Sequence, residues 1–176
     1  MNQVIDRVPA GGDVLEIACG TGVWTALLAD QATTLTAVDA APEMIEIARE
    51  RAPDATYVSA DILGWRPPRR YDVVFFGFWL SHVPAERFAD FWALVGESLV
   101  DGGRAVFVDE HVSAAGKEQW LGDEVVERSL SDGSRHRIVK AYLDPPELTA
   151  RLADLDWRAD VEALGPGWVV GEARRA

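Results

Sequence analysis

The stretch VLEIACGTGVWTALLADQATTLTAVDAAPEM, residues 14–44, contains the pattern that decides the fold. An apolar run ends at Gly20 and Gly22, a helix-like segment follows, and a second apolar run ends at Asp39. Glycines between a strand and a helix let backbone N–H groups approach a ligand closely. The stretch therefore predicts a site for a nucleotide-like ligand.

The composition bounds the class of protein. The chain has 176 residues, 48% hydrophobic and 26% charged, as expected for one globular domain over residues 1–176. Its formal net charge of −12 repels phosphate backbones and argues against a nucleic-acid partner. No apolar run approaches the roughly 20 residues that span a bilayer, and the polar start MNQVIDRVPAGG argues against a signal peptide. Because Cys19 is the only cysteine, we expect no internal disulfide and a cytoplasmic location away from the membrane.

Short apolar runs alternate with helix-like segments along the first two-thirds of the chain. The expected strands are residues 13–18, 35–39, 56–60, 72–76 and 104–109. The expected helices are residues 23–30, 42–52 and 85–100, the last ended by Asp101-Gly102-Gly103. This alternation predicts a parallel sheet with helices on both faces. The run VVFFGFWL, residues 73–80, is typical of a central strand covered on both sides.

The last third of the chain has a different pattern. Asp132-Gly133 between two strand-like runs, 125–130 and 135–142, predicts a β-hairpin. Asp144 is expected to cap a helix that ends near residue 155. Residues 157–164 and 168–173 flank Gly165-Pro166-Gly167 and are expected to pair as antiparallel strands.

Three acidic residues, Glu16, Asp39 and Asp61, lie in or just after successive strands. The carboxyl ends of parallel strands meet at one edge of a sheet, so we expect these carboxylates to surround one ligand. They suit a cationic group, ribose hydroxyls and the exocyclic amine of adenine better than a pyrophosphate. Thr25 replaces the third glycine of a dinucleotide site, and the Gly-Lys-Ser/Thr of a P-loop is absent. A positively charged adenosine without phosphate, such as S-adenosylmethionine, fits this description.

At these residues the sequence resembles the class I S-adenosylmethionine-dependent methyltransferases of the small-molecule type. The family's first motif stands as Glu16-Ile17-Ala18-Cys19-Gly20-Thr21-Gly22, with Ala18 in place of the first glycine. The likeness continues through residues 59–62, 71–84 and 104–110 to the closing helix and hairpin, and so covers nearly the whole chain. It implies a Rossmann-like, doubly wound α/β fold. The implied sheet has seven strands and is mostly parallel, with an antiparallel C-terminal strand. The hairpin predicted at residues 125–142 would add a small β-hairpin arm after strand five.

The resemblance also implies a site for S-adenosylmethionine, with S-adenosylhomocysteine as product, and no metal. Glu16 and the two loop glycines would hold the methionine part, Asp39 the ribose, and Asp61 the adenine. Alternative roles are core packing for Met44, helix capping for Asp61 and a small loop residue for Cys19. The full set of expected cofactor contacts is Glu16, Ala18, Cys19, Gly20, Gly22, Asp39, Ala40, Met44, Ala60, Asp61, Ile62, Phe76 and Gly77.

Methyl transfer depends largely on positioning, and a base is needed only when the acceptor must lose a proton. We expect a small organic acceptor, methylated at oxygen in preference to nitrogen or carbon. Residues 77–80 lack the Asn-Pro-Pro-Tyr of amino methyltransferases. The candidate bases are His82, which we prefer, and His111; the alternative for His82 is a core or cap role. The candidate acceptor contacts are Trp24, Phe78, Trp79, Glu110 and Trp120, with simple packing as the alternative for the tryptophans.

Few residues are available to cover the acceptor. About a dozen precede the first strand, so the pocket is either open or covered by residues 111–142, with Trp120 as an apolar part of that lid. The hairpin at residues 125–142 also offers a surface for a dimer. Two alternative functions stay open. One is a non-catalytic or partner-dependent S-adenosylmethionine-binding protein, and the other is an NAD-linked oxidoreductase of the same fold.

Overall fold

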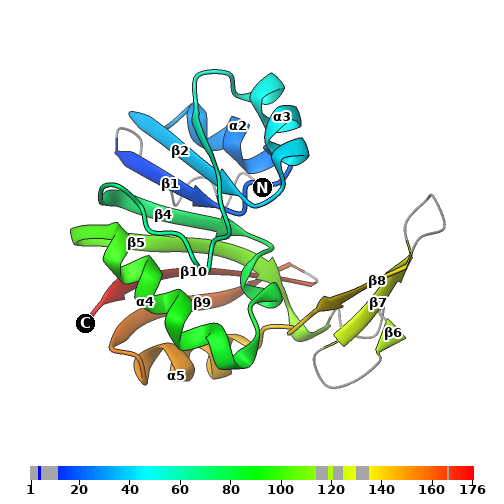
Figure 1. Ribbon diagram of the computed structural model, residues 1–176. Helices are drawn as coiled ribbons and strands as arrows, with labels where there is room; N and C mark the ends of the chain where they lie inside the picture. Colours follow the sequence, from blue (N-terminus) through cyan, green and yellow to red (C-terminus); the bar gives the residue numbers. More distant parts are fainter. Residues whose placement is uncertain (1–3, 5–11, 114–118, 121–124, 130–134, 166) are drawn as a thin grey trace.

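A seven-stranded sheet in the order β3-β2-β1-β4-β5-β10-β9 forms the centre of the protein in a computed structural model (Figure 1). The structure describes residues 4, 12–113, 119–120, 125–129, 135–165 and 167–176. Strand β10 pairs antiparallel with β5 and β9, whereas β1 to β5 pair in parallel, which confirms the expected sheet. The strands are β1 (Asp13–Ile17), β2 (Thr34–Asp39), β3 (Thr56–Ser59), β4 (Tyr71–Gly77), β5 (Leu99–Glu110), β9 (Trp157–Leu164) and β10 (Trp168–Arg175).

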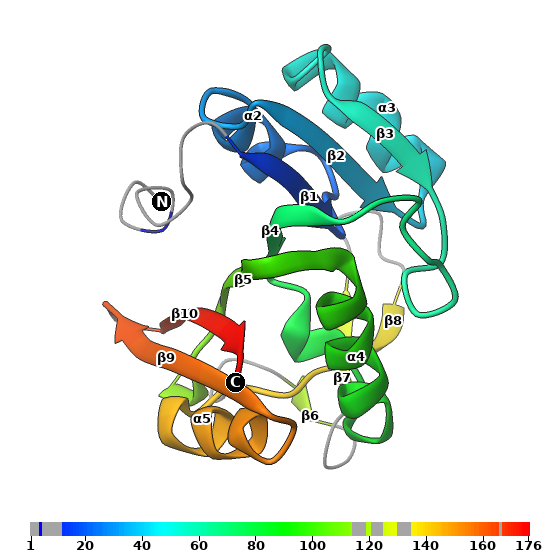
Figure 2. The same cartoon turned by 90° about the vertical axis from the view of Figure 1, so that its left-hand side faces the viewer.

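Helices cover both faces of this sheet, as expected (Figure 2). Two neighbours in β4 show the division, because successive side chains of a strand point to opposite faces. Phe76 packs edge-on against Phe91 at a ring-centroid distance of 5.2 Å, whereas Phe75 lies 5.4 Å from Trp24. Helices α4 (Phe88–Ser98) and α5 (Pro145–Ala153) therefore cover one face, and α2 (Val23–Ala29) and α3 (Pro42–Arg51) the other. In the part of the chain that the structure describes, no helix is long and apolar enough to cross a membrane.

Two element boundaries differ from the sequence prediction. The apolar run at residues 73–80 does not stay in one strand, because Phe78 adopts a left-handed backbone with φ of 55° after β4 ends. The chain then forms two single 3-10 turns, η1 (Leu80–His82) and η2 (Ala85–Arg87). The helix expected at residues 85–100 is only η2 followed by α4, and Leu99 already pairs with Tyr71 as the start of β5. The helix therefore ends at Ser98, just before pairing with β4 begins, and not at Asp101-Gly102-Gly103 as expected.

The C-terminal elements follow the sequence prediction closely. Asp144 caps α5, because its Oδ2 accepts a hydrogen bond of 3.3 Å from the backbone N–H of Glu147. Pro145 occupies the first turn of the helix, where a missing N–H costs nothing. Strands β9 and β10 form the expected antiparallel hairpin.

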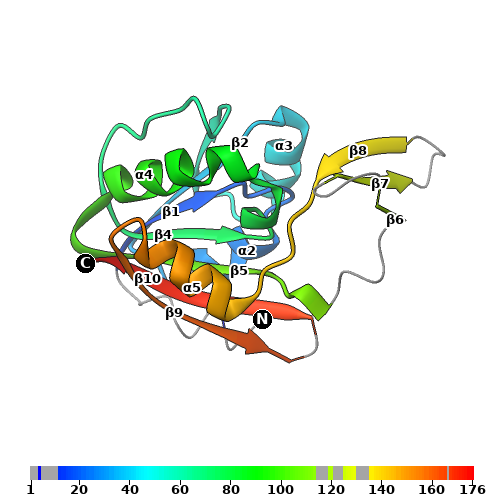
Figure 3. The same ribbon diagram turned by 90° about the horizontal axis from the view of Figure 1, so that it is seen from below.

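A second, three-stranded antiparallel sheet forms an arm between β5 and α5. It consists of β6 (Gln119–Trp120), β7 (Val125–Ser129) and β8 (Arg135–Val139). Figure 3 shows this arm projecting beyond the end of the sheet at which the parallel strands finish. The hairpin is confirmed, whereas β6 was not expected from the sequence. The predicted turn at Asp132-Gly133 lies outside the described residues.

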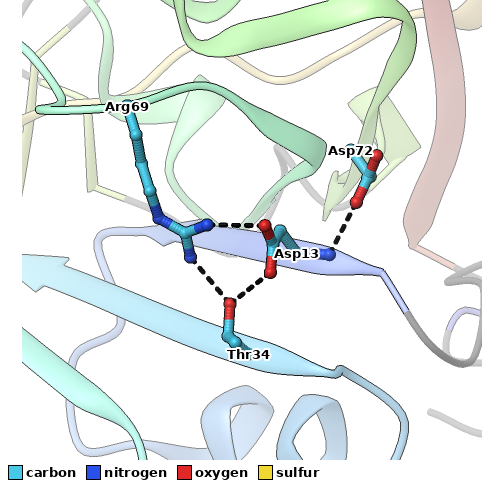
Figure 4. A network of polar contacts seen from close by, with 4 residues as sticks. All are labelled: Asp13, Thr34, Arg69 and Asp72. Carbon is cyan, nitrogen blue, oxygen red and sulfur yellow. Dashed lines mark hydrogen bonds and ion pairs between the residues drawn. The ribbon is translucent and has the colours of Figure 1, made fainter.

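A polar network joins Arg69 to strands β1, β2 and β4 at the amino ends of these strands (Figure 4). The guanidinium of Arg69 donates to Asp13 Oδ2 at 2.5 Å and to Thr34 Oγ1 at 2.7 Å, and Asp72 accepts from the Asp13 N–H at 2.7 Å. The hydrogen bond from Thr34, followed by the interaction with Arg69, lowers the pKa of Asp13. These contacts hold the amino ends of the strands together.

Candidate functional site

The glycine loop after β1 makes a tight turn that packs against α3. Gly20 and Gly22 both have positive φ, of 52° and 79°. A Cβ at Gly22 would lie 2.8 Å from the Cα of Ala48 in α3, so packing alone excludes a side chain there. A Cβ at Gly20 would meet nothing within 4 Å. Gly22 thus serves the fold, while Gly20 borders open space that a ligand can reach.

Ala18 stands where the family motif has its first glycine, and its backbone keeps the conformation that glycine favours. Its φ is 56°, in the left-handed region. A residue with a Cβ pays about 1–2 kcal/mol for this conformation. The loop thus takes a left-handed turn at this position without a glycine.

Glu16 is a carboxylate inside β1 and is only 1% exposed. Its Oε2 is buried and has no hydrogen-bond partner among the described residues. Burial raises its pKa to about 8; the Thr25 hydroxyl opposes this change without a well-aligned hydrogen bond, and the charge of Asp39 adds to it. A buried carboxyl group with an unused oxygen is costly unless a donor or cation reaches it. The geometry therefore fits the cationic amine of a ligand.

Asp39 ends β2 and holds the glycine loop. Its Oδ2 accepts from the N–H of Gly20 at 2.8 Å, and its Oδ1 accepts from the N–H of Ala41 at 2.9 Å. Each carboxylate oxygen can accept a second hydrogen bond, so both remain able to bind ribose hydroxyls. Ala40 and Met44 are exposed beside it, which excludes the core role considered for Met44.

The segment after β3 lies next to Asp39, because the N–H of Ala60 donates to the Asp39 carbonyl at 3.0 Å. Asp61 is exposed, and its Oδ1 accepts from the N–H of Leu63 at 3.3 Å, so it also stabilises a local turn. Ile62 is 3% exposed and belongs to the core beneath α4. The structure thus brings Asp61 to the expected edge with its carboxylate accessible.

The end of β4 is shaped by two aromatic side chains. The ring of Phe76 is fully buried and stacks on Phe107 at 5.4 Å, so only its backbone can serve a ligand. A Cβ at Gly77 would lie 2.6 Å from Nε1 of Trp24, so the indole packs directly against this glycine. Trp24 is 7% exposed and packs on the α2 side of the sheet. This agrees with the alternative role of simple packing given for the tryptophans.

The candidate acceptor residues after β4 are half-buried aromatic side chains. The ring of Phe78 lies 5.5 Å from that of Trp168, and the ring of Trp79 lies 6.5 Å from that of Phe91. The indole Nε1 of Trp79 is buried without a hydrogen-bond partner among the described residues. The side chain of Trp120 lies outside the described part of the chain.

The two candidate bases differ in the nitrogen that each can offer. Nδ1 of His82 lies 2.7 Å from the carbonyl oxygen of Val139. A carbonyl only accepts, so this nitrogen carries hydrogen, and Nε2 of the neutral ring is the atom that can take a proton. In His111, Nδ1 accepts from the N–H of Ser113 at 3.1 Å, which places the ring hydrogen on Nε2. The two rings therefore hold opposite tautomers, with the ring hydrogen on Nδ1 in His82 and on Nε2 in His111.

A buried charged cluster lies beside His82. It contains Glu110, which was expected to contact the acceptor, whereas Ser81 and Lys140 were not expected at the site. The carboxylate of Asp109, fully buried, accepts from the N–H of Ser81 at 2.9 Å and from that of Glu110 at 2.7 Å. Lys140, only 1% exposed, donates to Ser81 Oγ at 2.9 Å and forms an ion pair with Glu110. The available signal was a lone lysine within the apolar run IVKAY at residues 138–142.

Cys19 is a buried free cysteine in the glycine loop. Burial raises the pKa of its thiol to about 12, and the nearby charges of Glu16 and Asp39 act in the same direction. The thiolate needed for nucleophilic attack is therefore absent near neutral pH. Within the described ranges no group of His, Cys, Asp and Glu side chains is arranged to hold a metal ion.

Sequence comparison identifies relatives of the first half of the chain. A family described as a methyltransferase domain matches residues 14–103. Trans-aconitate 2-methyltransferase from Escherichia coli (strain K12 / DH10B) is 38% identical over 86 residues, which cover 47% of this chain and 34% of that protein. Trans-aconitate 2-methyltransferase from Escherichia coli O1:K1 / APEC is 38% identical over 73 residues, which cover 40% of this chain and 29% of that protein. The alignments thus span about a third of the length of these curated relatives.

Solved structures resemble nearly the whole chain. A DhpI–SAM–HEP complex is 37% identical, with a TM-score of 0.89 over 98% of this chain and 83% of that one. A DhpI–SAH complex is 36% identical, with a TM-score of 0.87 over 99% of this chain and 81% of that one. The glycopeptide N-methyltransferase MtfA bound to S-adenosyl-L-homocysteine is 18% identical, with a TM-score of 0.76 over 99% of this chain and 85% of that one, and so shares the fold.

Proposed function

The chain belongs to the class I S-adenosylmethionine-dependent methyltransferases, and on that basis we propose that it transfers a methyl group from S-adenosylmethionine to an oxygen of a small organic acceptor. The observation that carries the proposal is the buried, unpartnered Oε2 of Glu16 beside the glycine loop. S-adenosylmethionine, when bound, supplies an electrophilic methyl group on a sulfonium.

Different residues around the loop bind different parts of this cofactor. Glu16 pairs with the ligand amine, which satisfies the orphaned oxygen. Asp39 accepts from the ribose hydroxyls while it continues to hold the loop. The exposed carboxylate of Asp61 takes the adenine amine, and the backbone of Gly77 borders the methionine end. The buried carboxyl group of Glu16 beside the glycine loop would be a poor neighbour for a pyrophosphate, which disfavours the NAD-linked alternative.

His82 acts as the base when the acceptor is a hydroxyl. With S-adenosylmethionine and the acceptor bound, Nε2 would take the acceptor proton, so that the acceptor oxygen could receive the methyl group that the cofactor supplies. The carbonyl of Val139 holds the ring in the tautomer that this step needs. Methylation at oxygen is supported by the relative from Escherichia coli, because its name gives trans-aconitate, an organic acid, as the acceptor. An ionised acid brings its own nucleophilic oxygen and needs no base.

The arm covers the acceptor side of the site in this proposal. Strand β5 ends at Glu110, and strands β6 to β8 project beyond the end of the sheet at which the parallel strands finish (Figure 3). The root of the arm contacts η1 through Val139 and Ala141. A dimer through residues 125–142 remains a prediction, which sedimentation of the full chain tests directly.

Calorimetric titration and turnover test the function separately. We expect S-adenosylmethionine and S-adenosylhomocysteine to bind and NAD not to bind. Turnover on a panel of hydroxyl, carboxylic acid and amine acceptors should give methylated product at oxygen. Binding of NAD alone would overturn the cofactor assignment. Cofactor binding without turnover on any member of the panel would favour a non-catalytic or partner-dependent protein.

A further inference from the structure

Ser81 joins three parts of the molecule and uses all of its polar groups to do so. It lies in η1 and is fully buried. Its N–H donates to Asp109 of β5 at 2.9 Å, and its carbonyl accepts from Ala141 at 2.8 Å. Its hydroxyl accepts from Lys140 Nζ at 2.9 Å. The side chain and the backbone of this one residue therefore tie the end of β5 to the root of the arm.

The next residue along the chain is the candidate base. Nδ1 of His82 lies 2.7 Å from the carbonyl oxygen of Val139, the last residue of β8. Residues 139–141 thus touch residues 81–82 at three points in succession. The position of the Val139 carbonyl, and with it the tautomer of His82, depends on how the arm root is held.

Lys140 shows why the Ser81 hydroxyl matters for that position. A fully buried ammonium needs close partners, because an unpaired buried charge costs several kcal/mol. Its partners are Ser81 Oγ and the carboxylate of Glu110, and the ring of Tyr142 lies 5.4 Å away. Without the hydroxyl, Lys140 must shift to find another acceptor, and Val139 is its direct chain neighbour.

We propose that Ser81 is a positioning residue, which fixes the arm root so that the Val139 carbonyl holds His82 in the Nδ1–H tautomer. The inference rests on the proposed role of His82 as base. Ser98 offers a contrast within the same protein. It is equally buried, but its hydroxyl donates at 2.6 Å to the Leu94 carbonyl of its own helix α4. A buried serine with a local partner stabilises one element, whereas Ser81 connects η1 to β5 and to the arm root.

Nitrogen-15 chemical shifts of the imidazole rings test the proposal without any turnover. We expect neutral His82 to carry hydrogen on Nδ1 in the wild type and to become a mixture of tautomers in Ser81→Ala. Ser98→Ala is the matched control and should leave His82 unchanged. A His82→Gln variant assigns the signal. Retention of the wild-type tautomer in Ser81→Ala would overturn the proposal.

Steady-state kinetics provide the second test. Ser81→Ala should lower kcat on a hydroxyl acceptor about 10-fold to 100-fold and change the limb of the pH profile that reports the base, with KM for S-adenosylmethionine unchanged. Ser81→Thr restores a hydroxyl and should recover most of kcat. Equal losses in Ser81→Ala and Ser98→Ala would show a merely structural role. If the wild type transfers no methyl group, the proposed function fails, while the tautomer measurement still decides the role of Ser81.

Discussion

Glu16 lies inside a strand, where a carboxyl group is costly unless something pairs with it. The position of Glu16, and that of Asp39, could be predicted because both belong to strands that end at the same edge of the sheet. Their present contacts could not be predicted, because they depend on how the glycine loop folds back on Asp39. Ser81 and Lys140 escaped prediction for a related reason. Their hydrogen bond joins positions 59 residues apart, and no periodic pattern links such positions.

Cofactor binding should release a proton from Glu16. The raised pKa of about 8 keeps the unliganded carboxyl group largely protonated at pH 7, and a cationic amine selects the ionised form. Calorimetry of S-adenosylhomocysteine binding in buffers of different ionisation enthalpy counts this proton. Glu16→Gln should remove the release and weaken binding. Equal proton release in wild type and variant would show that the proton comes from another group.

The same group should make the unliganded protein less stable as pH rises. Between the unfolded pKa of 4.5 and the folded pKa of about 8, only the folded state keeps the Glu16 proton. The folded state therefore binds more protons, and the free energy of unfolding falls across this window. Urea unfolding of wild type and Glu16→Gln from pH 5 to 8 measures the difference. Parallel curves for the two proteins would contradict a raised pKa.

Replacement of Asp39 should affect both the ligand and the loop. Asp39→Ala should weaken S-adenosylhomocysteine binding by about 1.5–3 kcal/mol, the usual cost of losing hydrogen bonds to a charged acceptor. It should also destabilise the fold, since the N–H groups of Gly20 and Ala41 lose their acceptor. Asp39→Asn keeps one acceptor oxygen and should fall between wild type and Asp39→Ala. Unchanged affinity in Asp39→Ala would exclude a ribose contact.

At the scale of elements, the order of strands and helices followed from apolar runs and their punctuation, but several ends did not. β4 ends at Gly77 because Phe78 turns the backbone to positive φ, a conformation that no feature of an apolar run signals. α4 ends at Ser98 because Leu99 pairs with Tyr71 of β4, which is a tertiary contact. β6 has only two residues, too few for any alternation to show. Local signals therefore predicted the elements better than their limits.

The two loop glycines provide a matched test of packing between elements. Gly20 and Gly22 share positive φ, so an alanine at either costs about 1–2 kcal/mol in backbone strain. Only at Gly22 does the new Cβ also meet Ala48 of α3, which adds roughly 1–3 kcal/mol of overpacking. Thermal or urea unfolding should therefore show a larger loss for Gly22→Ala than for Gly20→Ala. Equal losses would mean that α3 moves away at little cost.

At the scale of the whole molecule, the two ends of the sheet have different tasks. The amino ends are joined by the hydrogen bonds of Arg69 to Asp13 and Thr34 (Figure 4). The carboxyl ends carry the glycine loop, Asp39 and His82, together with the arm. The chain leaves for the arm after His111 and returns at Leu143, and these two residues form a β-bridge. The arm is thus an insertion whose ends lie side by side.

This arrangement allows the arm to be removed while its root remains. Replacing residues 114–137 by about eight glycine and serine residues, which reach about 25 Å when extended, leaves Val139, Lys140 and Ala141 on η1. Cofactor binding should persist, because Asp39 and the glycine loop are held by hydrogen bonds within the first half of the chain, to Gly20 and Ala41. Acceptor KM should rise at least about tenfold, because the cover over the acceptor side is lost. Calorimetry with S-adenosylhomocysteine and turnover on the best acceptor measure the two effects, with circular dichroism as the check on folding. Loss of S-adenosylhomocysteine binding in the folded variant would assign the arm to the cofactor site, and an unchanged acceptor KM would show that the arm covers nothing that the acceptor touches.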